Sequence, residues 1–223
     1  MSFSIPTRFE RARTIFGVID TRRSLQERLA TVGYDDPVLA AGKSLYASAL
    51  ELRLRQQAAH LVKVNMTERA RQLYQRLKAS IHDLGKIAKA IFAGNRSALE
   101  ALGLQLGTMN NPRGKQSRRQ SVIVERARKL YDGLLTHPEL LATIAAVGYT
   151  FERLTAERDL IAQVEQADIA QESAKADALT ASREQNEAFK ALDVWLQRFV
   201  AVVAVALKDM PEELKALGIR PSR

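Results

Sequence analysis

Three short strings of this 223-residue sequence recur at one fixed spacing, and this self-similarity constrains the fold more than any other feature. The strings are Glu-Arg-Ala-Arg at 10–13 and 125–128, Val-Gly-Tyr at 32–34 and 147–149, and Ala-Leu-Gly-Leu at 101–104, which returns with a final isoleucine at 216–219. Each pair is separated by 115 residues, so segments 9–104 and 124–219 align without a gap. Recurrence at a single period indicates a structural unit that occurs twice in the chain.

The composition favours helices in both copies. Hydrophobic residues make up 46% of the chain and aromatic residues 6%, and only 6 prolines and 11 glycines interrupt it. The abundant residues alanine, leucine, arginine and glutamate lose little rotamer freedom in a helix. We therefore expect an all-α protein. The absence of cysteine excludes disulfide bonds and thiolate metal sites.

Apolar residues that step by three or four positions predict a long helical stripe in each copy, at 70–92 and at 188–207. Just before the first stripe, Asn65 and Glu68 match a capping box that would begin a new helix, and Thr180 lies at the corresponding place in the second copy. We therefore predict a hairpin of two antiparallel helices in each copy, with breaks near Asn65 and Thr180. One very long uninterrupted helix is the alternative.

Four glycines that follow apolar residues are expected to end helices in the left-handed conformation, namely Gly33, Gly103, Gly148 and Gly218. Each copy then contains two short helices, the long hairpin and a terminal turn of helix. Because a two-helix hairpin cannot bury its own stripe, we expect both hairpins to pack as a pseudo-twofold four-helix core, covered by the shorter helices.

Charge differs between the two halves. The expected organisation is a basic repeat unit at 1–104, a basic linker at 105–121 and an acidic repeat unit at 122–223. Within the aligned segments, 16 Lys and Arg oppose 9 Asp and Glu in the first, and 11 oppose 16 in the second, so the net charges are +7 and −5. Opposite charges of this size predict head-to-tail attraction, within one chain or between chains.

Nucleic acid or another polyanion is the alternative partner. The best candidate site is the cluster of linker residues Arg113, Lys115, Arg118 and Arg119. Elsewhere in the first copy the arginines are spread over several predicted helices with acids between them, and no aromatic residues interleave to stack on bases. The sequence therefore favours protein contacts over polyanion binding.

One acidic series is the main candidate for chemistry. Glu165, Asp168 and Glu172 fall on one helix face, with Glu157 two turns earlier, which would suit a hard cation or acid/base catalysis. We expect a solvated acidic face instead. No histidine has a Glu-x-x-His partner, and no Walker loop, dinucleotide fingerprint or nucleophile elbow occurs. We therefore expect a protein without a cofactor and without enzymatic activity; a metal or small-ligand site inside the bundle is a further alternative.

A few single residues carry packing predictions. Trp195 lies beside the second stripe and is expected to pack against a neighbouring helix rather than to anchor a partner. Tyr34 and Tyr149 are expected to be cap and packing residues. Gly42 and Gly85 lie inside predicted helices, where glycine is unfavourable, and should mark the close approach of another helix.

The expected location is the cytoplasm. Residues 1–16 lack the apolar core of a secretory signal, and the most apolar run, 199–207, has about nine residues where a membrane span needs about 20. Taken with the repeat and the charge pattern, the sequence predicts a structural, adaptor or self-assembling protein that acts through helix faces, with a second copy or another protein as its partner.

Overall fold

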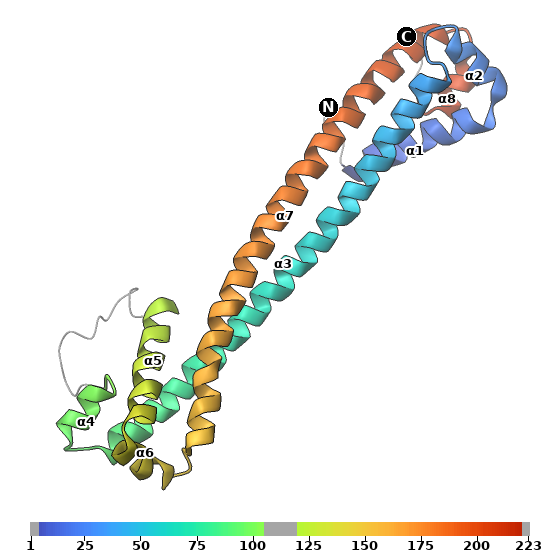
Figure 1. Cartoon of the computed structure of the whole chain (residues 1–223). Coiled ribbons are helices and arrows are strands. Elements are labelled where there is room, and N and C mark those ends of the chain that lie inside the picture. The colour runs from blue at the N-terminus through green and yellow to red at the C-terminus, as the bar shows by residue number, and fades with distance from the viewer. Residues whose placement is uncertain (1–4, 105–119, 220–223) are drawn as a thin grey trace. The chain divides into compact units, whose positions relative to one another are not determined.

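The computed structural model describes residues 5–104 and 120–219, and every element in these ranges is an α-helix (Figure 1). The helices are α1 (Ile5–Thr21), α2 (Arg23–Ala30), α3 (Asp36–Ile91), α4 (Arg96–Ala101), α5 (Gln120–Thr136), α6 (Pro138–Ala145), α7 (Phe151–Ala206) and α8 (Pro211–Ala216). The prediction of an all-α protein is thus confirmed for the described part of the chain.

The long helices α3 and α7 run without a break through Asn65 and Thr180, so the predicted hairpins are wrong. Side chains near Asn65 bond as they do in a helix interior. The Thr67 hydroxyl donates to the carbonyl oxygen four residues earlier at 2.8 Å, and Glu68 accepts from Gln72 at 3.0 Å instead of capping. Because neither glycine nor proline interrupts this stretch, the ladder of backbone hydrogen bonds continues.

Each described helix of the second half begins and ends 115 residues after a helix of the first half. The corresponding pairs are α1 and α5, α2 and α6, α3 and α7, and α4 and α8. Buried positions correspond as well: Ala12 and Ala127 have no exposed surface, and neither have Leu77 and Leu192. The spacing seen in the sequence strings therefore extends to helix bounds and to buried side chains.

Glycine ends helices where the sequence predicts it. Positive φ angles, from +67° to +88°, occur at Gly33, Gly103, Gly148 and Gly218. After each glycine the next N–H bonds back across the helix end, as from Tyr34 to the Leu29 carbonyl oxygen at 3.0 Å. This is the Schellman arrangement, in which glycine reaches the left-handed region at no steric cost.

The chain divides into two compact units, and neither is a consecutive half of the sequence. Unit 1 comprises 1–61 and 176–223, and unit 2 comprises 62–175. Unit 1 contains α1, α2, the N-terminal part of α3, the C-terminal part of α7 and α8, whereas unit 2 contains the rest of both long helices with α4, α5 and α6. The units differ from the predicted segments 1–104 and 122–223 because α3 and α7 continue from one unit into the other instead of folding back.

The core of unit 1 is rich in aromatic rings. Figure 1 shows α1, α2 and α8 beside the N-terminal end of α3 and the C-terminal end of α7. Phe9 meets Phe189 edge-on with 5.0 Å between ring centres, and Trp195 stacks on Phe199 at 5.2 Å. Aromatic pairs at these distances add packing energy beyond the area that they bury.

The core of unit 2 is mostly aliphatic. Its fully buried side chains include Leu77, Leu84, Leu134, Ile144 and Leu154. Most of the buried hydrophobic residues of the described ranges therefore belong to two separate clusters, one in each unit. This arrangement replaces the expected single four-helix core, because continuous long helices bring different neighbours to their two parts.

The charge separation of the sequence halves does not carry over into the compact units. By sequence, unit 1 contains 16 basic and 13 acidic residues and unit 2 contains 18 and 12, so their net charges are +3 and +6. Each unit combines segments from both halves of the sequence. The excess of basic residues in the first half is therefore partly offset by the excess of acidic residues in the second half. Attraction between a basic unit and an acidic unit therefore has no basis in these net charges.

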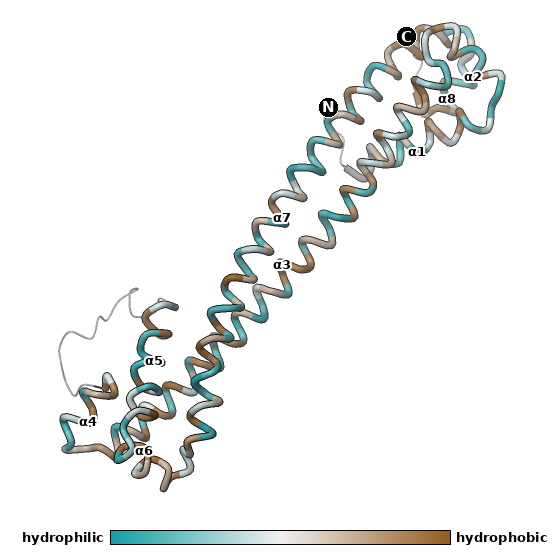
Figure 2. The backbone as a smooth tube through the Cα atoms, in the orientation of Figure 1, coloured by the Kyte–Doolittle hydropathy of each residue, from teal (hydrophilic) through white to brown (hydrophobic). Residues whose placement is uncertain are grey.

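None of the helices in the described ranges has an apolar stretch long enough to cross a membrane. Hydrophobic and hydrophilic residues alternate along α3 and α7 (Figure 2), as is typical of helices that bury one face. The most apolar run, 199–207, packs into the core of unit 1 through Phe199, Val203 and Leu207.

Candidate functional site

A small, partly buried polar cluster borders the largely aliphatic core of unit 2. The Ser80 hydroxyl of α3 donates a hydrogen bond to Oε2 of Glu157 on α7 at 2.5 Å, and the Tyr131 hydroxyl of α5 donates to the same oxygen at 3.0 Å. The other carboxylate oxygen of Glu157 accepts from Arg153 Nε at 3.0 Å. Side chains of three helices thus meet at one carboxylate, whose side chain is only 19% exposed.

Arg153 connects this carboxylate to the residues that precede α7. Its guanidinium carbon lies 3.8 Å from the ring centre of Tyr149, and its Nη1 donates to the Gly148 carbonyl oxygen at 3.2 Å. Stacking on the tyrosine ring holds the cation beside Glu157. A poorly solvated carboxylate is tolerated when it is paired and hydrogen-bonded, and Arg153 supplies that pairing.

The cluster links three helices of unit 2 through hydrogen bonds. Tyr131 has no exposed surface, and burial raises its pKa well above the ordinary value of 10.0. The hydrogen bond with Ser80 partly lowers this pKa, and the charge of Glu157 raises it further. Tyr131 therefore stays protonated and keeps donating to the carboxylate. Because the polar groups satisfy one another, the network supports a unique arrangement of α3, α5 and α7 within the unit.

Replacing Tyr131 with phenylalanine is expected to lower the free energy of unfolding by about 1–2 kcal/mol near neutral pH, because Glu157 loses a donor. The raised pKa also makes the wild type lose stability as the pH rises past about 10, where the unfolded chain releases the tyrosine proton and the folded chain retains it. Tyr131→Phe abolishes this contribution. The difference in free energy of unfolding between the variant and the wild type should therefore shrink at alkaline pH. Urea unfolding at neutral and alkaline pH measures both effects.

Ser80→Ala is the matched control, since it also removes a donor to Glu157 but keeps the tyrosine. The loss of unfolding free energy in Ser80→Ala, relative to the wild type, should therefore be the same at both pH values. A Tyr131→Phe deficit that grows with pH would contradict the assignment of the raised pKa to this residue.

Positions 115 residues away fill the corresponding place in unit 1 with aromatic rings. The correspondences are Ser80 to Trp195, Tyr131 to Phe16 and Glu157 to Gly42. The rings of Phe16 and Trp195 lie 5.3 Å apart, and a Cβ on Gly42 would come within 2.3 Å of indole carbon Cζ2. Unit 1 thus combines a large ring with glycine where unit 2 combines serine with glutamate.

The structure tests the packing predictions for individual residues. Trp195 is partly buried and packs against the aromatic core of unit 1, as predicted, and Tyr34 contacts it edge-on at 5.9 Å between ring centres. Tyr149 is buried in the core of unit 2. The predicted close approach at Gly42 is confirmed, although the neighbour is an indole ring and not a helix backbone. At Gly85 the nearest atom is a leucine methyl group at an ordinary 3.7 Å, so no close approach explains this glycine.

The structure does not bring the acidic series of α7 together. Glu165 pairs with an arginine of α5 at 2.5 Å, and Glu172 pairs with a lysine of its own helix at 2.6 Å. Glu157 belongs to the polar cluster, and Asp168 is exposed. Within the described ranges, no group of three or more histidine, aspartate or glutamate residues is placed to hold a metal ion.

The other predicted site residues do not form a site in the described ranges. The linker residues Arg113, Lys115, Arg118 and Arg119 lie outside these ranges. His60 and His82 are exposed on α3. His137 precedes α6, and its Nδ1 lies 2.8 Å from the Gly133 carbonyl oxygen, which accounts for its position structurally.

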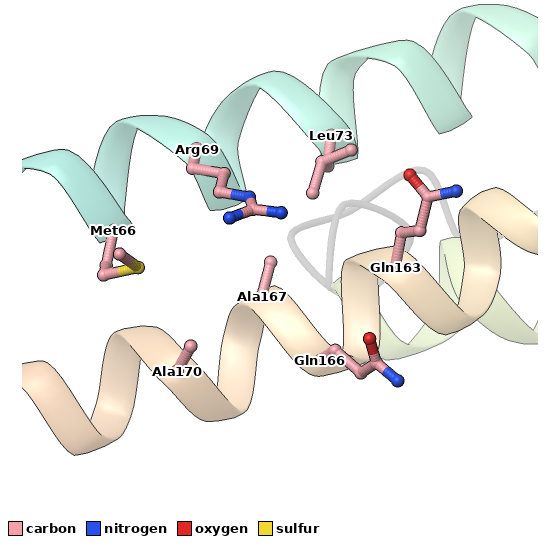
Figure 3. A pocket seen from close by; sticks show the side chains of 7 residues that line it. All are labelled: Met66, Arg69, Leu73, Gln163, Gln166, Ala167 and Ala170. Atoms are coloured by element: carbon pink, nitrogen blue, oxygen red, sulfur yellow. The ribbon is translucent and has the colours of Figure 1, made fainter.

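A pocket of about 230 Å³ opens between α3 and α7 in unit 2 (Figure 3). Its walls are formed by Met66, Arg69, Leu73, Gln163, Gln166, Ala167 and Ala170. Figure 3 shows the Arg69 guanidinium projecting from α3 toward Ala167 of α7, while Gln163 rises from α7 toward α3. This pocket therefore combines a cation and amide groups with an apolar wall.

A larger cleft of about 660 Å³ lies on unit 1. Its lining includes the rings of Tyr34 and Trp195, aliphatic side chains, and the two cations Lys190 and Arg198. Since Trp195 and Tyr34 are partly buried side chains that pack against the core, this cleft lies at the exposed edge of the aromatic cluster.

Comparison with known proteins gives no match: no family model fits the sequence, and no curated protein or solved structure resembles it significantly.

Sequence reasoning missed Ser80, Tyr131 and Arg69 because none belongs to a short motif. The signal lay in the differences between the aligned segments. At the spacing of 115 residues, a serine opposes a tryptophan and a glutamate opposes a glycine, which marks the place where the two units pack differently.

Proposed function

We propose that this protein is a non-enzymatic structural, adaptor or self-assembling component that acts through its helix faces. The observation that carries the proposal is a leucine stripe on α3 in unit 1, which consists of Leu50, Leu54 and Leu61. These side chains are 40%, 59% and 63% exposed. Spacings of four and seven residues place them on one side of the helix.

The core of unit 1 does not use the leucine stripe. On another side of α3, Ala49 is fully buried and the Arg53 guanidinium lies 5.2 Å from the ring centre of Phe9. A single exposed leucine is ordinary, but several aligned along one helix form the kind of apolar surface that partners cover. A helix of a second copy, laid along the stripe, would remove these side chains from water.

We also propose that segments 9–104 and 124–219 are two copies of one repeat with a pseudo-twofold relation. The equal spacing of the helices and the matching glycine caps support this proposal. So does the packing within each unit. Arg22, the residue before α2, pairs with Glu213 of α8 at 2.6 Å in unit 1, and α4 contacts α5 in unit 2. In this arrangement each copy contributes helices to a core that neither copy completes alone.

We expect the full-length chain to self-associate as its concentration rises, at high salt as well as at low salt, because apolar contacts are not screened. The double variant L54E/L61E is expected to stay monomeric, since it places charges in the leucine stripe. Val205→Glu is the control, because Val205 is 72% exposed on α7 of the same unit and lies outside the stripe. Sedimentation velocity measures the mass of each species.

Two outcomes contradict self-association through the leucine stripe. One is a wild-type chain that is monomeric at every concentration at both salt levels. The other is association that L54E/L61E and Val205→Glu leave equally unchanged. Association that disappears at high salt would indicate contacts between charges instead of contacts between leucines.

Polyanion binding is the second candidate function, and the positive net charge of both units favours it. Adding duplex DNA to the same sedimentation experiment tests this candidate. A complex that forms at low salt and weakens steeply with added salt supports it. A variant with four substitutions distinguishes the contribution of the linker to binding from that of the rest of the chain. In this variant glutamine replaces Arg113, Lys115, Arg118 and Arg119.

A further inference from the structure

We propose that the pocket between α3 and α7 in unit 2 binds a small carboxylic acid with an apolar body, and that Arg69 holds its carboxylate. This proposal is independent of the leucine stripe, which lies in unit 1. It rests on the lining of the pocket, on the absence of an anionic partner for Arg69, and on the way unit 1 fills the corresponding place.

Arg69 is a cation without an anion in the described part of the chain. The next arginine on α3 differs in this respect, because Arg71 lies 3.9 Å from Glu68 of the same helix. Arg69 instead forms part of the pocket wall, with its guanidinium between α3 and α7 (Figure 3). A guanidinium presents several N–H donors in a fixed plane, which matches the two oxygens of a carboxylate.

The corresponding place in unit 1 contains an ion pair. At the spacing of 115 residues, Arg69 corresponds to Glu184 and Ala170 corresponds to Arg55. Arg55 and Glu184 join α3 to α7 at 3.1 Å. In unit 2 the position of the glutamate holds Arg69 and the position of the arginine holds Ala170, so a cation stands where unit 1 has the anion and the small alanine leaves the space opposite it open. The missing component is an anion small enough to enter this space.

The rest of the lining selects the kind of anion. Gln163 and Gln166 carry amide N–H groups that can donate to carboxylate oxygens. Four of the seven lining side chains are apolar: Met66, Leu73, Ala167 and Ala170. An inorganic phosphate would leave these walls uncovered and would face a single cation. A carboxylate on an aromatic or aliphatic body satisfies both the polar groups and the apolar walls.

Binding is tested with 4-fluorobenzoate, titrated into the full-length chain and observed by ¹⁹F NMR. The neutral isostere 4-fluorobenzamide is the control compound, and it should bind much more weakly because it offers Arg69 no charge. Arg69→Gln is expected to weaken benzoate binding by about 10–100-fold, the loss associated with a charged hydrogen-bonded contact. Arg71→Gln removes the same charge two residues away and should leave the affinity within about twofold of the wild type.

A second variant supplies the missing anion from the protein itself. Ala170→Glu places a carboxylate opposite Arg69, so it should abolish benzoate binding and raise the melting temperature. Ala170→Gln occupies similar volume without the charge and should not give this rise. The proposal is overturned by equal affinity for the acid and the amide, by equal weakening in Arg69→Gln and Arg71→Gln, by an Ala170→Glu variant that still binds benzoate, or by a wild-type chain that gives no ¹⁹F response.

Discussion

Replacing Phe199 with alanine is expected to lower the free energy of unfolding by about 3–5 kcal/mol. The ring has no exposed surface in the core of unit 1. It stacks on Trp195 at 5.2 Å and meets Tyr34 edge-on at 5.0 Å between ring centres, so truncation leaves a cavity and removes both aromatic contacts. Trp195 is the only tryptophan of the chain, and its fluorescence during urea unfolding reports on this core.

Val205→Ala on the same helix is the control for this prediction. Val205 is 72% exposed, so the loss of its two methyl groups should change the free energy of unfolding by less than about 0.5 kcal/mol. If Phe199→Ala costs no more than the control, the aromatic core of unit 1 is packed differently from the arrangement described.

Placing proline at position 66 is expected to cost about 3 kcal/mol or more, because proline removes a backbone donor and clashes with the preceding turn inside a helix. This substitution distinguishes the continuous helix from the hairpin that the sequence suggests. If Asn65 were an N-cap, Met66 would be the first helical residue, where proline is well tolerated. In the structure, Met66 instead lies deep inside α3.

Met66→Ala is the matched control, because it shortens the same side chain and keeps the backbone N–H. Its cost should be well below that of Met66→Pro, since Met66 is only partly buried. Circular dichroism should show a loss of helix for the proline variant alone. Equal stability of Met66→Pro and Met66→Ala would contradict an unbroken α3.

The features that could be predicted from the sequence are those set by neighbouring residues. Helical periodicity identified the all-α class. The glycines at 33, 103, 148 and 218 marked helix ends correctly, because a left-handed residue at a helix terminus depends on local backbone sterics. The tight site at Gly42 was also predictable, since glycine in a helix interior needs a packing reason.

The features that could not be predicted depend on distant residues. Asn65 and Glu68 form a plausible cap when they are considered alone. The same side chains are also compatible with the interior of a long helix, where Glu68 accepts a hydrogen bond from Gln72. Continuity of α3 then decides which segments share a core. The network of Ser80, Tyr131 and Glu157 joins three helices, and no linear spacing specifies such a meeting.

The discontinuous make-up of unit 1 has a consequence for synthesis from the N-terminus. Unit 2 is a single stretch, so all of its residues are available once the ribosome has added residue 175. The helices α1 and α2 must wait for α8, whose last residue is Ala216, before their apolar side chains are covered. We therefore expect the N-terminal helices to be the last to gain protection in a nascent chain, and to be the segment that a chaperone would hold in the meantime.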